Sequence, residues 1–215
     1  MVQEKTADVK TMTEFTAKKQ KILQAALDFA EDGRWPEASL DALAVAAGLA
    51  AAEAAEIFSC REEIVSAVLQ DIDDRMAAED FGFNPARDGV KDRLFEVIML
   101  RLDLLNENRE AMRVLLKDLT ASPAAALQHK SAFCHTMRLI FEKADIDFSA
   151  VWQEEAAVPA LAAAYMATLA SWRHDDSADM AKTMAALDRN LSRMMRFLAV
   201  FPFRDSGGKS IWSNP

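Results

Sequence analysis

Residues 38–61 read ASLDALAVAAGLAAAEAAEIFSCR, and this stretch decides the fold. Ser39 is a typical helix N-cap, and Gly48 is typical of the turn that ends a helix, because glycine adopts a positive φ without steric cost. Apolar residues recur between them at helical spacing: Leu40, Leu43, Ala44 and Ala47. A further helix is expected at 51–58. The stretch therefore predicts two short helices that cross closely at a tight turn.

The rest of the chain continues this helical pattern. Good helix formers dominate its 215 residues, whereas six Gly, six Pro and a single Tyr leave little material for strands. The sequence predicts an all-α protein. We expect helices at 17–33, 40–47, 51–58, 61–81, 90–106, 108–120, 123–143, 148–173 and 177–200.

The first of these helices contributes to a resemblance to a known family. The segments ILQAALDFAEDG, ASLDALAVAAGL and IFSCREEIVSAVL resemble the N-terminal domain of the tetracycline-repressor (TetR) family. The resemblance implies a helix-turn-helix module followed by a helical ligand-binding and dimerisation domain. It also implies a transcriptional regulator that responds to an apolar small molecule. A three-helix bundle without a DNA role fits the same pattern.

The second half of the chain resembles another family. The coenzyme Q biosynthesis accessory family, which consists of lipid-binding proteins with a TetR-like fold, is similar over about residues 90–197. The residues that carry this similarity are Tyr165, Thr168, Leu169, Trp172, Asp175 or Asp176, Ser177, Leu187, Asp188 and Arg189. It implies the alternative function, an accessory protein that binds isoprenoid or other lipid and does not bind DNA.

The two resemblances imply a division of the chain. We expect a disordered arm at 1–15, a helix-turn-helix module at 16–62, a helical ligand-binding and dimerisation domain at 63–203, and a flexible tail at 204–215. The arm is predicted because its residues are polar and lack helical period.

The expected DNA-contact surface is unusual in its charge. The candidates are Lys18, Lys19, Lys21, Ser39, Ala50, Ala51, Glu53 and Arg61. Base edges are read by Arg, Lys, Asn, Gln, Ser or Thr, and none of these lies between Gly48 and Phe58. The whole chain carries a net charge of −9, which gives no long-range attraction to a polyanion. The lysines also fit a solvated helix start.

Apolar and polarisable residues in the second half fit a ligand pocket. The candidates are Phe95, Met99, Arg101, Leu102, Met112, Leu116, Phe133, Met137, Phe141, Trp152, Tyr165 and Trp172. Methionine adapts to varied apolar ligands, although an ordinary core uses it as well. Arg101, Tyr165 and Trp172 are the residues of this set that could make polar contacts with a ligand.

The last helix carries an apolar stripe that fits a homodimer seam. The candidates are Ala162, Met166, Leu169, Met184, Leu187, Leu191, Met194, Met195 and Leu198. Burial against the same subunit would use the same stripe. The apolar end RMMRFLAVFPF at 193–203 fits a partner or a weak membrane-surface contact.

Catalytic chemistry finds little support in the sequence. His129 and His135 lie on different faces of a helix, and no nucleotide-binding, hydrolase or metalloprotease motif is present. His174, Asp175 and Asp176 suggest a metal cluster, but Asp176 or Ser177 as the cap of the last helix explains them more simply. We expect no enzyme activity, no cofactor, no metal and a cytoplasmic location.

Overall fold

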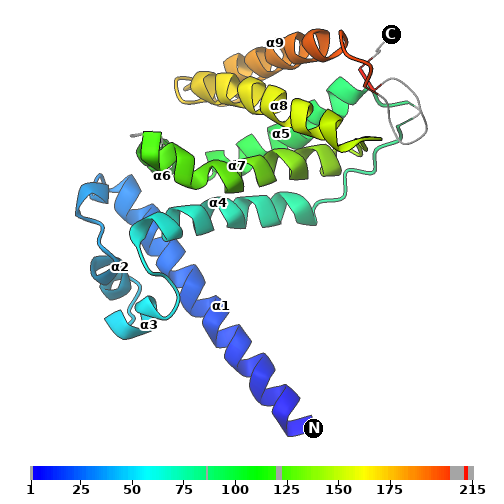
Figure 1. Cartoon of the computed structure of the whole chain (residues 1–215). Helices are drawn as coiled ribbons and strands as arrows, with labels where there is room; N and C mark the ends of the chain where they lie inside the picture. The colour runs from blue at the N-terminus through cyan, green and yellow to red at the C-terminus, as the bar shows by residue number, and fades with distance from the viewer. Residues whose placement is uncertain (1, 86, 120–122, 204–210, 213–215) are drawn as a thin grey trace. The chain divides into compact units, whose positions relative to one another are not determined.

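The computed structural model describes residues 2–85, 87–119, 123–203 and 211–212, and these residues form helices and connecting segments without a strand (Figure 1). The all-α prediction is therefore confirmed. The elements are α1 (Val2–Glu31), η1 (Trp35–Glu37), α2 (Leu40–Ala46), α3 (Ala51–Ala55), α4 (Arg61–Ala78), α5 (Val90–Asn106), α6 (Arg109–Leu119), α7 (Pro123–Lys143), α8 (Val151–Trp172) and α9 (Ala181–Leu198).

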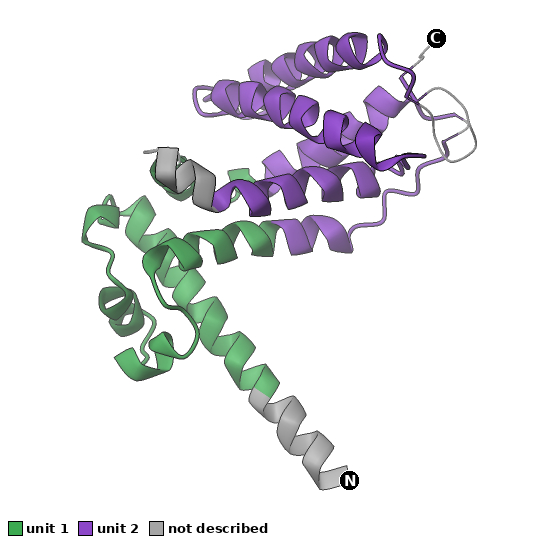
Figure 2. Ribbon diagram, in the orientation of Figure 1, with its two compact units in different colours: residues 1–72, 105–127 green, residues 73–104, 128–215 purple. Residues whose placement is uncertain are grey.

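The chain divides into two compact units (Figure 2). Unit 1 comprises residues 1–72 and 105–127, and unit 2 comprises residues 73–104 and 128–215. This division differs from the predicted boundary after residue 62. The reason is that α6 packs against α1, so that a segment from the middle of the chain completes the N-terminal unit.

Unit 1 contains the two short helices and their turn. The Ser39 hydroxyl accepts a hydrogen bond from the Ala42 amide at 3.1 Å, which confirms the predicted N-cap of α2. Gly48 has a φ of 68°, and the Leu49 amide donates to the Ala44 carbonyl at 2.9 Å. This is the pattern of a glycine-dependent helix end. The buried core of unit 1 includes Ile22, Leu23, Ala26, Phe29, Leu43, Ala44, Ala54 and Phe58.

The first helix is longer than the sequence predicts. The structure has α1 beginning at Val2, where a disordered arm was expected at 1–15. Helix formation needs no apolar face when the residues themselves favour the helix, and Glu, Lys, Ala, Val, Thr and Met between Val2 and Glu14 include several good helix formers. The missing period therefore indicated the lack of an apolar stripe along the helix and not the lack of a helix.

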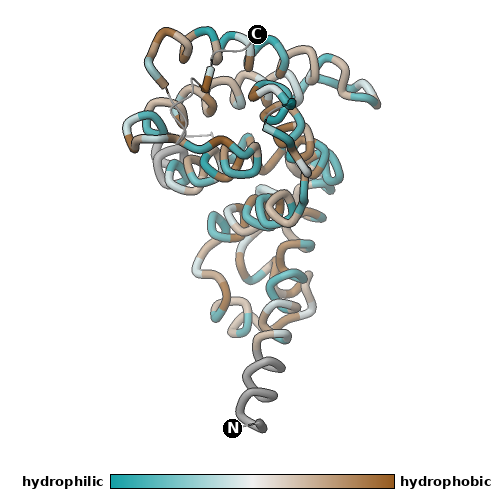
Figure 3. Tube along the Cα trace, turned by 90° about the vertical axis from the view of Figure 1, so that its right-hand side faces the viewer, coloured by the Kyte–Doolittle hydropathy of each residue, from teal (hydrophilic) through white to brown (hydrophobic). Residues whose placement is uncertain are grey.

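Unit 2 is built around the antiparallel helices α8 and α9, which pack against each other (Figure 1). Figure 3 shows that apolar and polar residues alternate along the helices, as expected for elements that bury one face. Helix α8 departs from this rule, because residues 156–172 contain no charged side chain. Among the described residues no helix is both long and apolar enough to cross a bilayer.

The end of the chain is partly ordered, contrary to the predicted flexible tail. Ile211 and Trp212 are buried, and the Ile211 amide donates to the Phe203 carbonyl at 3.3 Å. The Trp212 ring lies 5.8 Å from that of Phe203 and 6.4 Å from that of Phe141. Aromatic residues give even a short tail enough buried surface to dock. Residues 204–210 and 213–215 lie outside the described part of the chain.

Candidate functional site

The surface of α3 is the first candidate site. Ala50 and Ala51 are exposed, so the helix presents methyl groups at the predicted DNA-contact positions. Glu53 bends back to its own helix start, where its carboxylate accepts from the Ala50 amide at 2.9 Å. The same carboxylate pairs with Lys18 at 2.8 Å. The Glu53 carboxylate therefore already binds the Lys18 ammonium group and the Ala50 amide, two groups that could otherwise bind a phosphate.

The pKa values at this pair follow the same contact. The hydrogen bond from Lys18 lowers the pKa of Glu53, and the hydrogen bond to Glu53 raises the pKa of Lys18. Both charges are held in place at neutral pH, and a phosphate that approached Lys18 would have to displace Glu53.

Arg61 has a structural role in unit 1. Its guanidinium pairs with Asp118 of α6 at 3.3 Å and lies over the Trp35 ring at 5.1 Å from the centroid. The Trp35 indole also donates to Asp118 at 3.2 Å. Arg61 therefore joins α4, η1 and α6, and its side chain is only partly available for a phosphate.

The remaining cations of the predicted set are Lys19 and Lys21. Lys21 is exposed and Lys19 is half-buried, and neither forms an ion pair with the described residues. Ser39 is used as the N-cap of α2. Of the eight predicted positions, Lys19 and Lys21 are thus the cations that remain open to a phosphate backbone.

Unit 2 contains a second candidate site, a polar network in its interior. Arg101 Nε donates to Asp73 Oδ1 at 2.8 Å, and both side chains are at most 5% exposed. The Arg101 guanidinium also donates to the Tyr165 hydroxyl. The Thr136 hydroxyl donates to Asp73 Oδ2 at 2.5 Å. One buried cluster thereby joins α4, α5, α7 and α8.

Burial shapes the ionisation of this network. Burial disfavours the charged guanidinium of Arg101, but the Tyr165 and Asp73 oxygens outweigh that effect and raise its pKa. Burial raises the pKa of Tyr165, so its hydroxyl stays neutral. The network is therefore one ion pair with two neutral hydroxyl groups.

The predicted ligand-pocket residues do not share one unit. Met112 and Leu116 lie in α6 of unit 1, whereas the other candidates lie in unit 2. Leu102, Met137 and Trp172 are core residues. Phe95 and Met99 are half-buried on α5, and the Phe133 ring lies 6.0 Å from that of Tyr165.

Two of the aromatic candidates lie apart from the polar network. The Trp152 ring is 47% exposed and lies 5.5 Å from the Phe203 ring, so it belongs to the surface of unit 2. Phe141 is buried and lines a cavity that is described below. Arg101 and Tyr165, two of the residues predicted to supply polar contacts to a ligand, are in direct contact. A pocket shared by all the candidates remains a prediction.

The predicted dimer stripe is used mainly inside the chain. Leu187, Leu191 and Leu198 are fully buried in the single chain. The other buried members are Leu169, Met194 and Met195, whereas Ala162 and Met184 are half-buried. Met166 is 42% exposed. The alternative, burial against the same subunit, therefore describes most of the stripe.

The turn before α9 explains the acidic residues that suggested a metal. The buried Asp175 carboxylate accepts from the Thr183 amide at 2.8 Å and from the Thr183 hydroxyl at 2.7 Å. It also accepts from the amide and hydroxyl of Ser177. Burial alone would raise the pKa of Asp175, but these hydrogen bonds outweigh it and lower the pKa. The Ser177 hydroxyl, one of the two predicted caps, accepts from the Ala181 amide at 3.2 Å, and Asp175 is a further anchor of the helix start that was not predicted.

Comparisons with known proteins identify the architecture. A TetR transcriptional regulator from Nitrosomonas europaea ATCC 19718 is similar at 21% identity and a TM-score of 0.66, over 82% of this chain and 97% of that chain. One from Rhodococcus sp. RHA1 is similar at 15% identity and a TM-score of 0.65, over 84% and 97%. The chain has the TetR fold. A third TetR-family structure, from Streptomyces coelicolor, gives a TM-score of 0.56 at 20% identity over 85% of both chains.

A family comparison adds a second likeness within the TetR fold. A model of the COQ9 family matches residues 159–198, which cover most of α8, the Asp175 turn and α9. No curated protein matches the chain. Both resemblances inferred from the sequence thus have a counterpart, one in the fold and one in the α8–α9 segment.

Asp73 and Thr136 are functional candidates that sequence reasoning missed. Asp73 stands among Asp71 and Asp74 in α4, and the letters alone do not distinguish a buried carboxylate from a solvated one. The partners of Asp73 are Arg101 of α5 and Thr136 of α7, so no pattern within α4 marks this carboxylate as buried.

Proposed function

We propose that this protein is a TetR-type transcriptional regulator that responds to an apolar small molecule. The observation that carries the proposal is the fold, which spans more than four fifths of the chain and includes a complete α2–turn–α3 unit. Contact with the phosphate backbone would come from Lys19 and Lys21 and from backbone amides of unit 1. Sequence readout would rest on DNA shape, because α3 offers methyl groups to the bases.

The ligand in this proposal enters unit 2 among α5, α7 and α8. The half-buried Met99, Phe95 and Phe133 supply apolar contacts, and the Arg101–Tyr165 pair supplies polar ones. Because Asp73 ties the end of α4 to this network, a ligand that rearranges the network would move α4. Helix α4 also contributes residues to unit 1, which gives a ligand a route to the helix-turn-helix.

A genomic-fragment selection at low salt tests the regulator. A regulator recovers a defined set of fragments, and its affinity for them falls with salt, with a slope near −0.9 for each phosphate contact. Lys19→Ala with Lys21→Ala should make the slope less steep by about two contacts. Lys130→Ala, an exposed lysine of unit 2, is the matched control. Recovery of no fragment would exclude the regulator.

A second candidate function is a COQ9-like accessory protein that binds isoprenoid or other lipid and no DNA. Two observations favour it, namely the family match over residues 159–198 and the engagement of Lys18 and Glu53 with each other. In this case the α2–turn–α3 unit stabilises unit 1, and its surface binds no nucleic acid.

Copurifying lipid tests the second candidate. Native mass spectrometry of protein purified from cells that make ubiquinone should show an added mass, and extraction should identify an isoprenoid lipid. Protein made in cells deficient in isoprenoid quinones is the control. A single unliganded species from both sources, together with fragment recovery in the DNA selection, would decide for the regulator.

We also propose that the protein is a homodimer and that α8 supplies the contact. A helix that is apolar all round is normally buried, yet Met166, Ala163 and Ala170 of α8 are exposed in the single chain. A second copy is the occupant that fits, because an identical uncharged face pairs with itself about a two-fold axis. Sedimentation should show a dimer, and Met166→Glu should yield monomer, whereas Lys130→Glu should not.

A further inference from the structure

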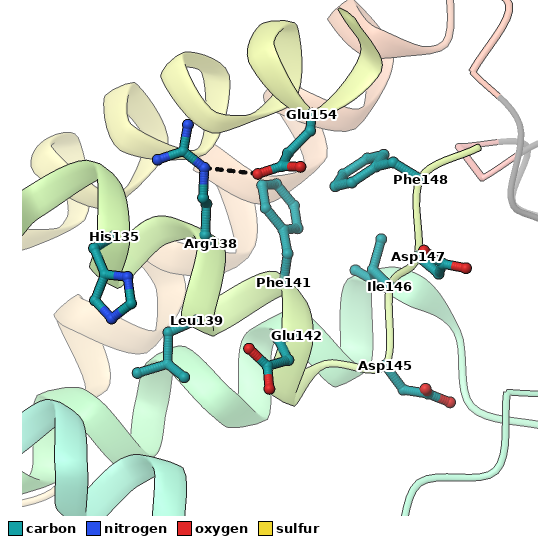
Figure 4. Close-up of a pocket in the computed structure, with 10 residues that line it drawn as sticks. All are labelled: His135, Arg138, Leu139, Phe141, Glu142, Asp145, Ile146, Asp147, Phe148 and Glu154. Carbon is teal, nitrogen blue, oxygen red and sulfur yellow. Dashed lines mark hydrogen bonds and ion pairs between the residues drawn. The ribbon is translucent and has the colours of Figure 1, made fainter. Parts of the chain in front are cut away.

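A surface cavity of about 520 Å³ lies in unit 2 between the C-terminal half of α7 and the segment 144–150 that leads into α8 (Figure 4). Its volume falls within the range of small-molecule sites, which is roughly 300–1,000 Å³. Neither DNA binding, lipid binding nor dimerisation as proposed above uses it. Phe141 is the one member of the predicted ligand-pocket set among its described lining residues.

One wall of the cavity is aromatic and apolar. The rings of Phe141 and Phe148 meet edge to face with their centroids 5.2 Å apart, and Figure 4 shows Ile146 beside them. The Phe148 ring also lies 6.4 Å from the Trp212 ring. Phe141 and Ile146 are buried and Phe148 is half-buried, so the Phe148 ring is the part of this wall that can accept apolar surface or a cation.

The polar wall carries an excess of negative charge. Four of the described lining residues are carboxylates, and one is a guanidinium. Arg138 pairs with Glu154 at 2.6 Å across the mouth, as the dashed line in Figure 4 shows. Glu142 and Asp147 have no ion-pair partner among the described residues. These two uncompensated carboxylates therefore add net negative charge to the lining of the cavity.

The segment that forms the second side is held in place from within. Arg93 of α5 is buried, and its guanidinium donates to the Ala144 carbonyl and, at 2.6 Å, to the Asp145 carbonyl. Asp145 itself has a φ of 52°, a left-handed conformation that a non-glycine residue keeps only when its surroundings hold it. The cavity is therefore preformed, which lowers the entropic cost of binding.

We propose that this cavity binds an organic ammonium ion with an aromatic or apolar body, such as an arylalkylamine. The body packs on the half-buried Phe148 ring, which contacts the buried Phe141, and the negative charge of Glu142 and Asp147 attracts the ammonium group. A metal ion does not fit, because the described residues hold no group of three metal-ligating side chains. The aromatic wall likewise favours an organic cation over a hydrated inorganic one.

Three probes of matched shape test the charge requirement. Phenethylamine, 2-phenylethanol and 3-phenylpropionate share one ring and differ in charge, and their binding to the full chain is measured by calorimetry at about pH 8. Phenethylamine should bind with a Kd below about 1 mM, and the neutral and anionic probes should bind at least roughly tenfold more weakly.

Two variants locate the site. Glu142→Gln with Asp147→Asn keeps the shape of both exposed side chains and should weaken phenethylamine binding roughly tenfold. Phe148→Leu keeps an apolar wall without the ring and should weaken it about threefold. Glu155→Gln, an exposed carboxylate of α8 outside the cavity, is the control and should change nothing.

Each of three results overturns the proposal. The first is a phenethylamine Kd above about 1 mM, and the second is equal affinity for the three probes. The third is unchanged affinity in the Glu142→Gln, Asp147→Asn variant with an unchanged thermal midpoint. None of these results bears on DNA or lipid binding, so the proposed functions stand or fall separately.

Discussion

Unit 1 and unit 2 each join helices through an arginine and an aspartate, but the two pairs lie in different surroundings. Arg61 and Asp118 of unit 1 are 28% and 34% exposed, whereas Arg101 and Asp73 of unit 2 are 5% and 4% exposed. A pair that water reaches contributes little, and either partner is replaceable. A dry pair is costly to break, because the remaining charge has no solvent. The ion pair of unit 1 should therefore tolerate substitution, whereas the ion pair of unit 2 should not.

The largest effect should come from breaking the buried pair on one side. Arg101→Met keeps much of the side-chain volume but leaves the Asp73 carboxylate buried without its cation. We expect a loss of about 3–5 kcal/mol in the free energy of unfolding, measured by chemical denaturation.

The matched control replaces both partners. Arg101→Met with Asp73→Leu removes both charges and should recover most of the loss, because an apolar pair needs no solvation. A single-variant loss below about 1 kcal/mol would mean that water reaches the network and that the two units do not differ in this respect.

A smaller effect should follow at the Asp175 turn of unit 2. Asp175→Asn loses the charge that accepts hydrogen bonds from Thr183 and Ser177, and we expect a loss of about 2 kcal/mol. Asp147→Asn removes an exposed carboxylate of the same unit and should cost no more than about 0.5 kcal/mol. Urea denaturation at neutral pH compares the two variants.

The pH dependence supplies an independent check of this carboxylate. Its folded-state pKa is lowered, so its contribution to stability is present above the unfolded pKa of about 3.9 and is lost as the pH falls toward the folded value. The Asp175→Asn variant should therefore lose stability less steeply than the wild type below about pH 4. Parallel curves for the two proteins would contradict the assignment of the lowered pKa to Asp175.

The corresponding pair of unit 1 should have a still smaller effect. Asp118→Asn removes the charge that Arg61 pairs with but keeps an oxygen for the Trp35 indole. We expect a loss of about 1 kcal/mol or less, and one that shrinks in high salt because the pair is partly exposed. A loss as large as that of Arg101→Met would abolish the contrast between the units.

Local signals in the sequence were enough for most of the fold. Ser39 and Gly48 act through their own backbone neighbours, so their roles at the ends of α2 could be predicted from position alone. The all-α class and the boundaries of α5 and α7 follow in the same way from periodicity and breaks. A disordered arm was predicted at 1–15 because this segment lacks an apolar face, whereas the structure has α1 beginning at Val2.

The sites depend on partners that are distant in the sequence, and this limits prediction. Asp73 and Arg101 are 28 residues apart, and Asp73 and Thr136 are 63 apart, so no local pattern marks the network. The cavity beside Phe141 depends on the backbone turn at Asp145 that Arg93 holds. Lys18 was identified as a cation available to DNA, and only the structure reveals its pairing with Glu53.

The smallest predicted effect concerns that last pair and decides what the surface of unit 1 can become. Glu53→Gln keeps an oxygen for the Ala50 amide but loses the charge that holds Lys18. Stability should stay nearly unchanged, since both side chains are partly exposed and such a pair contributes little. On any recovered DNA fragment, the slope of binding against salt should become steeper by about one phosphate contact. Lys130→Ala leaves the slope as it is, and an unchanged slope in Glu53→Gln would show that Lys18 faces no phosphate even when it is released.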